Sequence, residues 1–162
     1  MAKKKKDTQE GIKLIAKNRR ARYEYHLLQV VEAGLVLTGT EVKSLRNGKA
    51  SLEDAHAKIT SDGEIFLHDL NIPEYTHGNI MNHDPKRKRK LLLKRSEIRK
   101  IEAKVKEKGV TLIPTRLYFK KGWAKVEIAL AEGKKLYDKR QDMKKKDARR
   151  DMDRAMRSGY KD

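Results

Sequence analysis

Two apolar segments joined by a short polar turn constrain the fold of this chain more than any other feature. Residues 110–119 and 123–131 flank the turn Lys120-Lys121-Gly122. In the second segment an apolar series alternates with Trp123, Lys125, Glu127 and Ala129; its members are Ala124, Val126, Ile128 and Leu130. A period of two predicts a strand with one buried face, and glycine in the turn favours a hairpin. The outer face then presents Trp123 and Lys125 to solvent.

Further short elements are predicted on both sides of this hairpin. Residues 23–37 indicate a long strand bent at Gly34, and residues 56–60 and 64–72 indicate two strands around a Ser-Asp-Gly turn. A capping box at 38–41 predicts a short helix that ends at Asn47-Gly48, and a second helix begins at Ser96 and ends at Gly109. Residues 12–15 indicate a turn or short helix, and 73–85 a surface loop. Several strands with glycine corners favour a mainly β, closed or partly closed antiparallel barrel over residues 23–133.

The charge of the chain is concentrated in separate blocks. The 162 residues carry a net charge of +18, and 40% are charged, which is too polar for packing throughout. The charge is +7 over residues 1–22, −6 over 23–85, +9 over 86–108, +2 over 109–133 and +6 over 134–162. Blocks of one sign predict solvated tails and a polyanionic partner.

Other classes of function lack their sequence signals. Zero cysteines exclude disulfides and thiolate sites, and the five histidines have no metal-ligand spacing, so no metal or other cofactor is expected. The Asn47-Gly48-Lys49 segment fails the phosphate-loop pattern, and the carboxylates nominate no acid and base pair. No apolar run is long enough for a membrane span, and Lys3–Lys6 precede no signal-like segment. We expect a cytoplasmic protein that is not an enzyme and does not contact membranes.

Cations interleaved with aromatic rings favour RNA as the polyanion. Arg19 and Arg22 lie beside Tyr23 and Tyr25, and Trp123 lies beside Lys125. Such groups suit RNA with unpaired bases, which stack on aromatic planes. The basic run 86–90 fits the same hypothesis, although a solvated loop explains it when it is considered alone.

Four strings of the sequence carry a resemblance to a known family: residues 37–51 with the preceding Asn18-Arg-Arg-Ala-Arg22, then 84–93, 117–126 and 133–140. These strings resemble the small protein B family, the tmRNA-binding proteins of bacterial trans-translation. The resemblance implies an OB-fold-like closed antiparallel β-barrel with two or three short helices. It also implies a disordered basic N-terminus at 1–10, an RNA-binding barrel domain at 11–133, and a basic tail at 134–162 that is disordered when free and helical on the ribosome.

The family resemblance implies a ribosome-rescue adaptor rather than an enzyme. Such a protein binds the tRNA-like domain of tmRNA, promotes its entry into stalled ribosomes, and reads the vacant decoding centre and mRNA path with its tail. Its partners are tmRNA and the ribosome, with elongation factor Tu and alanyl-tRNA synthetase reached through alanylated tmRNA, and the chain is expected to be a monomer. The alternative is a structural ribosomal protein embedded permanently in rRNA.

The resemblance also assigns residues to two sites. With the outward Trp123 and the basic Arg19, the tmRNA site comprises Asn18, Arg22, Tyr25, Glu32, Leu92 and Lys125. The ribosome-binding tail comprises Tyr137, Asp138, Lys139, Arg140, Lys144 and Lys146. Tyr137 stands where the family often has histidine, so a role that requires an imidazolium is not expected here.

Overall fold

The computed structural model describes residues 11–77, 81–107 and 109–159. The hairpin predicted from the alternating pattern is present in it as two long paired strands. Strand β6 (Val110–Lys120) pairs with β7 (Trp123–Gly133) along its length. Lys121 and Gly122 have φ angles of 49° and 82°. Two successive left-handed residues are the signature of a type I′ turn, whose twist matches that of the flanking strands. The hairpin prediction is confirmed.

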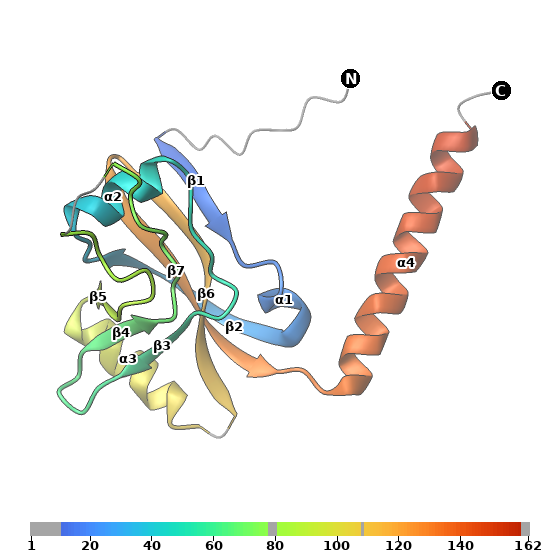
Figure 1. Ribbon diagram of the computed structural model, residues 1–162. Coiled ribbons are helices and arrows are strands. Elements are labelled where there is room, and N and C mark those ends of the chain that lie inside the picture. The colour runs from blue at the N-terminus through green and yellow to red at the C-terminus, as the bar shows by residue number, and fades with distance from the viewer. Residues whose placement is uncertain (1–10, 78–80, 108, 160–162) are drawn as a thin grey trace.

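Five further strands join this hairpin in a seven-stranded antiparallel sheet within the described residues (Figure 1). They are β1 (Ile12–Lys17), β2 (Tyr25–Leu35), β3 (His56–Ile59), β4 (Ile65–His68) and β5 (Arg89–Leu92). Pairings run from β7 through β2, β5, β4 and β3 to β6, which pairs again with β7, and β1 pairs with the end of β6. The mainly β class with several helices is confirmed.

Two helices pack apolar side chains into the core of the sheet. Helix α2 (Gly39–Arg46) begins with the predicted capping box, in which the Thr38 amide donates to Glu41 Oε2 at 2.8 Å. Its Leu45 is fully buried. Helix α3 (Arg95–Val105) buries Ile98 and Ile101 along the predicted stripe. Both helices are therefore held by tertiary packing of one face.

Gly34 allows β2 to pass from one neighbour to another. Residues up to Gly34 pair with β7, while Gly34 and Leu35 also pair with β5. A Cβ atom at Gly34 would lie 3.2 Å from the Cβ of Leu92, so a side chain here would require β5 to shift slightly away. The register irregularity of β2 lies elsewhere, between Leu27 and Gln29.

The N-terminal segment differs from the sequence prediction. Residues 12–17 form strand β1 rather than a turn or helix, because they pair with β6 from the other end of the domain. The expected strand from Tyr23 begins with a short helix, α1 (Ala21–Glu24), and β2 follows it. Ala21 is buried in a small second cluster with Ile113 and Ala131. Because this cluster packs against Ala131, the last part of β7 is covered on the face that was expected to be exposed.

Histidine 83 lies in the expected 73–85 loop, yet its ring is buried. Its Nε2 lies 2.8 Å from the Ile72 carbonyl oxygen, and its Nδ1 lies 2.9 Å from the Thr40 hydroxyl. The ring therefore links this segment to α2. Strand β5 was not predicted at all, since its sequence Arg-Lys-Leu-Leu was interpreted as part of a basic block.

Helix α4 (Leu136–Gly159) occupies the tail, so the expected disorder of residues 134–162 is not confirmed. The helix stands beside the sheet (Figure 1) and has no buried residue. Ion pairs one turn apart support it, Arg150 with Asp147 and Arg154 with Asp151. The N-terminal expectation for residues 1–10 lies outside the described residues. No helix in the described ranges is long and apolar enough to cross a membrane.

Candidate RNA interface

The outer face of β7 carries the ring and the cation predicted there. Trp123 is 73% exposed and follows directly after the left-handed turn. Lys125 lies two residues further on the same face and is half-buried. In the residues that the structure describes, no carboxylate forms an ion pair with the Lys125 ammonium, and its charge is one of those that lower the pKa of Glu32. An open indole beside this ammonium can stack on a base and bind a phosphate.

Glu32 on β2 is held in place by two side chains of β6, the strand on the other side of β7. The buried Tyr118 hydroxyl donates to Glu32 Oε2, and the Lys120 ammonium lies 3.4 Å from both carboxylate oxygens. The Tyr118 hydrogen bond is the largest influence that lowers the pKa of Glu32, and Lys120 adds to it. Burial, followed by the bond to Glu32, raises the pKa of Tyr118. At neutral pH this carboxylate is ionised and oriented, so it can accept from a base amino group.

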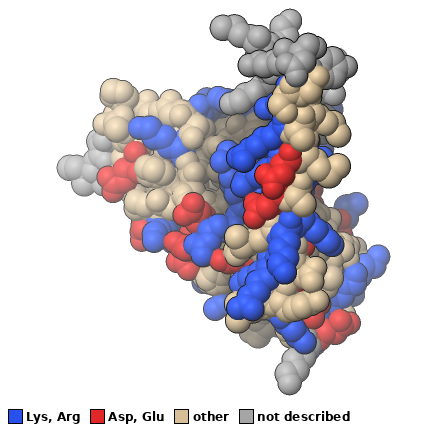
Figure 2. Space-filling model, turned by 90° about the vertical axis from the view of Figure 1, so that its right-hand side faces the viewer, with Lys and Arg blue, Asp and Glu red and all other residues tan. Residues whose placement is uncertain are grey.

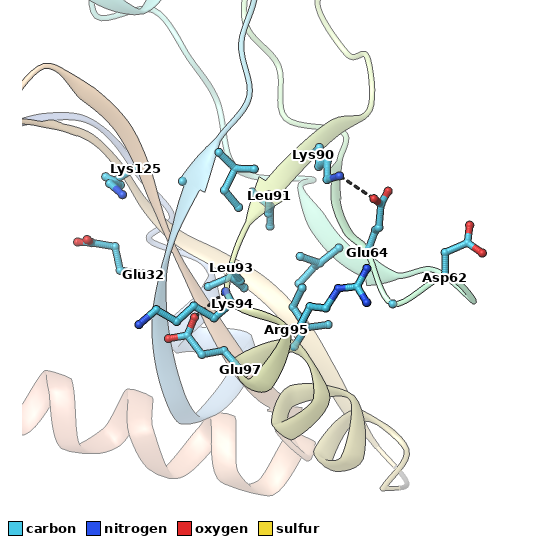
Figure 3. Close-up of a pocket in the computed structure, with 15 residues that line it drawn as sticks. Glu32, Asp62, Glu64, Lys90, Leu91, Leu93, Lys94, Arg95, Glu97 and Lys125 are labelled. Carbon is cyan, nitrogen blue, oxygen red and sulfur yellow. Dashed lines mark hydrogen bonds and ion pairs between the residues drawn. The ribbon is translucent and has the colours of Figure 1, made fainter.

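A groove brings three of the predicted tmRNA-site residues together. Its volume is about 570 Å³, and Glu32, Leu92 and Lys125 line it with side chains from β4, β5 and α3 (Figure 3). Lys125 pairs with Gly34 on β2, and Gly34 pairs with Leu92 on β5. Lys125, Gly34 and Leu92 therefore form one row across three strands, and Glu32 lies two residues before Gly34 on β2. Leu92 is 54% exposed, so it is accessible beside the two charges.

The basic run 86–90 is only partly available to a ligand. The Arg89 side chain is fully buried, and its Nε donates to Glu41 Oε1 at 2.8 Å. Arg87 also donates to Glu41, and Lys90 forms a 2.6 Å ion pair with Glu64. The interpretation of the whole run as an RNA-facing block is therefore wrong for Arg89, whose charge is used inside the fold.

Asn18, Arg19 and Arg22 lie where β1 leads into α1, and they differ in exposure. The Asn18 side chain is buried: its Nδ2 donates to the carbonyls of Leu52 and Pro114, and its Oδ1 accepts from the Ala21 amide. Both arginines are exposed. The structure thus gives Asn18 the role of fixing this corner, while direct RNA contact by the two arginines stays a prediction.

Tyr25 and Tyr23 differ in their exposure to solvent. Tyr25 is half-buried against the second apolar cluster, and Tyr23 is 45% exposed. The Tyr23 hydroxyl lies 3.5 Å from Met143 Sδ, and the Lys139 ammonium lies 5.9 Å from its ring centroid. The more open ring belongs to Tyr23, which the family resemblance did not assign to the tmRNA site.

A second groove lies between this corner and α4. Its volume is about 580 Å³, and its cations come from both sides: Lys17, Arg19, Arg22, Lys146 and Arg150. Asp142 and Asp147 also line it. Figure 2 looks onto α4 and shows Lys and Arg side chains along the helix with a smaller acidic group between them.

The predicted tail residues begin α4 and have unequal surroundings. The Tyr137 ring is 70% exposed, and its hydroxyl accepts from Gln141 Nε2 at 2.9 Å. Asp138 lies 3.5 Å from the His26 ring on β2. Three other predicted cations, Arg140, Lys144 and Lys146, are exposed, and Lys139 is half-buried over Tyr23. The structure therefore places the predicted tail residue Lys146 in one groove with the predicted barrel residues Arg19 and Arg22. The other groove contains Glu32, Leu92 and Lys125.

Sequence reasoning missed the residues that position this interface. Tyr118 was interpreted only as part of a strand, and Glu41 only as part of a capping box. No local sequence pattern indicates that the Tyr118 hydroxyl donates to Glu32, because the two residues lie 86 positions apart. In the described ranges no cluster of three or more His, Cys, Asp or Glu side chains could hold a metal ion.

An antiparallel sheet with an exposed indole, lysines and basic grooves is typical of small RNA-binding proteins. The SmpB protein model matches residues 15–158, so the chain belongs to the SmpB family. The resemblance to the small protein B family is confirmed.

The chain is similar to individual proteins over most of their length. A protein named SsrA-binding protein from Thermobifida fusca (strain YX) is 59% identical over 155 residues, covering 96% of each chain. Another of that name, from Geobacter metallireducens (strain ATCC 53774 / DSM 7210 / GS-15), is 58% identical and covers 93% of this chain and 98% of its own. A solved structure described as "tmRNA-SmpB: a journey to the center of the bacterial ribosome" is 47% identical, with a TM-score of 0.64, and covers 78% of this chain and 87% of its own.

Proposed function

We propose that this chain binds tmRNA, the SsrA RNA, and acts as the RNA-binding adaptor of trans-translation on stalled ribosomes. Membership of the SmpB family over residues 15–158 carries this proposal. The relatives named SsrA-binding protein and the tmRNA-SmpB structure point to the same RNA. The exposed Trp123, the neighbouring Lys125 and the oriented Glu32 supply the chemistry that such a partner requires.

The tRNA-like domain of tmRNA occupies the surface formed by Glu32, Leu92, Trp123 and Lys125, with Arg19 and Arg22 extending it. In this proposal Lys125 binds a phosphate, Trp123 stacks on an unpaired base, and Glu32 accepts from a base amino group. Asn18 and Tyr25 support the corner that carries the arginines. An OB-like closed barrel holds these residues at fixed spacing.

We propose further that the tail, residues 134–162, enters the ribosome. Tyr137 and the cations at 139, 140, 144 and 146 bind rRNA in the vacant mRNA path and decoding region. The absence of buried residues in α4 supports this division, since the sheet does not need the helix for its own core. Elongation factor Tu and alanyl-tRNA synthetase act through the alanylated tmRNA, in the cytoplasm.

Binding measurements with two RNAs test the first step. The purified chain is titrated with the tRNA-like domain of tmRNA and with an elongator tRNA of similar length. We expect clearly tighter binding to the tRNA-like domain, and equal affinities would contradict the proposal. A structural ribosomal protein would instead remain stoichiometric on all ribosomes after high-salt washing. Turnover of RNA or nucleotide by the pure chain would replace the adaptor with an enzyme.

A further inference from the structure

Tyr118 is a buried aromatic ring on the outer face of the sheet. It is only 3% exposed, yet its neighbours on β6, Leu117 and Phe119, are the ones that enter the main hydrophobic core. Because side chains alternate along a strand, the Tyr118 ring points to the opposite face. Tyr118 pairs with Lys125 across β6 and β7, so the two side chains share that face. A buried phenol therefore belongs to the candidate RNA interface.

The Tyr118 hydroxyl serves one acceptor. In the described part of the chain its hydrogen-bond partner is Oε2 of Glu32, which it reaches across the whole width of β7. Burial, followed by the bond to Glu32, raises the pKa of Tyr118, so the hydroxyl stays protonated and keeps donating at neutral pH. The second contact of Glu32, the Lys120 ammonium, lies 3.4 Å from both carboxylate oxygens.

Glu32 needs a firm restraint, because a like charge lies opposite it. Glu32 pairs directly with Glu127 across β2 and β7, and like charges at such positions repel. Arg116 lies 3.4 Å from Glu127 and belongs to that carboxylate. The Lys120 contact with Glu32 is long, and the lysine side chain is 43% exposed, so it restrains the carboxylate weakly. The buried Tyr118 hydroxyl is therefore the main group that fixes the direction of Glu32.

The arrangement leaves Oε1 of Glu32 for a ligand. Oε2 accepts from Tyr118, whereas the long Lys120 contact is the one that Oε1 makes among the described residues. Glu32 and Lys125 both line the 570 Å³ groove (Figure 3). A carboxylate oxygen accepts from the amino group of a base and repels a phosphate, whereas an ammonium binds phosphate beside any base. Glu32 thus supplies base selectivity, and Lys125 supplies affinity that is independent of sequence.

We propose that Tyr118 is a positioning residue for RNA recognition: its hydroxyl holds Oε2 of Glu32, so that Oε1 is presented to the exocyclic amino group of an unpaired base. This inference rests on the proposed function, because the RNA concerned is the tRNA-like domain of tmRNA. Tyr118 is too deeply buried to touch the RNA, so it acts through Glu32 alone.

A double-mutant cycle between Tyr118→Phe and Glu32→Ala tests this role in the full chain. Phenylalanine fills the same space and removes only the hydroxyl. We expect Tyr118→Phe to bind the tRNA-like domain about tenfold more weakly, the scale of one hydrogen bond to a charged group, with an unchanged salt slope because no phosphate contact is lost. In the Glu32→Ala background the same change should cost nothing further. The matched control, Tyr75→Phe, removes a hydroxyl from a residue that does not line the groove and leaves the affinity unchanged.

Carbon-13 NMR of the Glu32 carboxyl group in the free protein gives an independent readout. The Tyr118 hydrogen bond is the largest influence that lowers the pKa of Glu32. Tyr118→Phe should therefore raise this pKa, which a purely structural contribution of the ring would not do. The other charged groups around Glu32 or along its groove stay in place in this variant: Lys120, Lys125, Glu127, Lys94 and Glu97.

Three results would overturn the proposal. Wild-type affinity in Tyr118→Phe removes the hydroxyl from recognition. Additive losses in the double variant show that Tyr118 acts by a route other than Glu32. An unmoved Glu32 pKa shows that the hydroxyl does not hold the carboxylate. If the wild type itself does not prefer the tRNA-like domain to an elongator tRNA, the proposed function fails instead. Thermal unfolding of each variant confirms that the sheet is intact.

Discussion

Replacement of Glu41 by glutamine tests the buried ion-pair cluster beneath the basic run. The Glu41 carboxylate is fully buried and accepts from Arg89 Nε at 2.8 Å, from Arg87 Nε and Nη2 at 2.7 Å, and from the Thr38 amide at 2.8 Å. Glutamine keeps the shape but removes the charge, so Arg89 stays buried without an anion. Removal of one partner from a buried pair costs about 3–5 kcal/mol. We therefore expect the free energy of unfolding to fall by that amount.

Urea unfolding of Glu41→Gln beside Glu64→Gln measures this effect against a matched control. Glu64 pairs with Lys90, the neighbour of Arg89, but both side chains are more than 40% exposed, so its loss costs about 0–1 kcal/mol. Similar costs for the two variants would refute the argument that burial decides the difference.

Acid titration adds a second readout. Burial alone raises the pKa of Glu41, but the bonds from Arg87 and Thr38 and the charge of Arg89 outweigh it and lower the pKa. A carboxyl group with a lowered folded-state pKa stabilises the fold above its ordinary pKa, and this contribution is lost as the pH falls through the folded value. The gap in stability between wild type and Glu41→Gln should therefore be widest near neutrality and narrow on acidification. A gap that is constant with pH would contradict this.

Three further predictions concern the RNA interface. Lys125→Ala should reduce the salt slope of tRNA-like RNA binding by about 1 in filter binding, and an unchanged slope would remove Lys125 from the site. Trp123 is the sole tryptophan and is 73% exposed, so its fluorescence should change on addition of the tRNA-like domain but not on addition of a peptide of equal charge; no change would argue against stacking. Truncation after Gly133 should leave thermal unfolding of the sheet and tRNA-like binding almost unchanged, while peptide tagging on stalled ribosomes is lost, because α4 buries no residue. Equal loss of RNA affinity would show that the two roles are not separable.

The parts of the fold that were predictable are those fixed by local signals. Alternation and a glycine turn identified the β6–β7 hairpin, and the Thr38–Glu41 box identified α2. Strand β1 was missed because its pairing partner lies about a hundred positions away, which no local pattern encodes. Strand β5 was missed because a buried arginine resembles a solvated one until Glu41 is placed beside it.

The candidate site shows the same division. Outward positions such as Trp123 and Lys125 follow from the strand period, so the sequence alone placed them together. The residues that orient the site depend on strand neighbours: Tyr118 reaches Glu32 only because β6 and β2 both flank β7. Lysines with and without a carboxylate partner also look alike in a sequence, and among the described residues it is Glu64 that distinguishes Lys90 from Lys125.

Arg87 and Arg89 share the Glu41 carboxylate, so the conformation of the basic run 86–90 depends on helix α2. Cut out as a peptide, residues 86–90 would display five mobile cations, whereas the folded chain buries Arg89 and ties Arg87 to α2. Because the helix cap, the strand and the loop that carries His83 all meet at α2, a graft of this segment onto another protein would transfer its net charge but not the pattern of open and closed positions. The choice of which cations of the run can reach a ligand therefore depends on Glu41 in the cap of α2 as well as on the lysines.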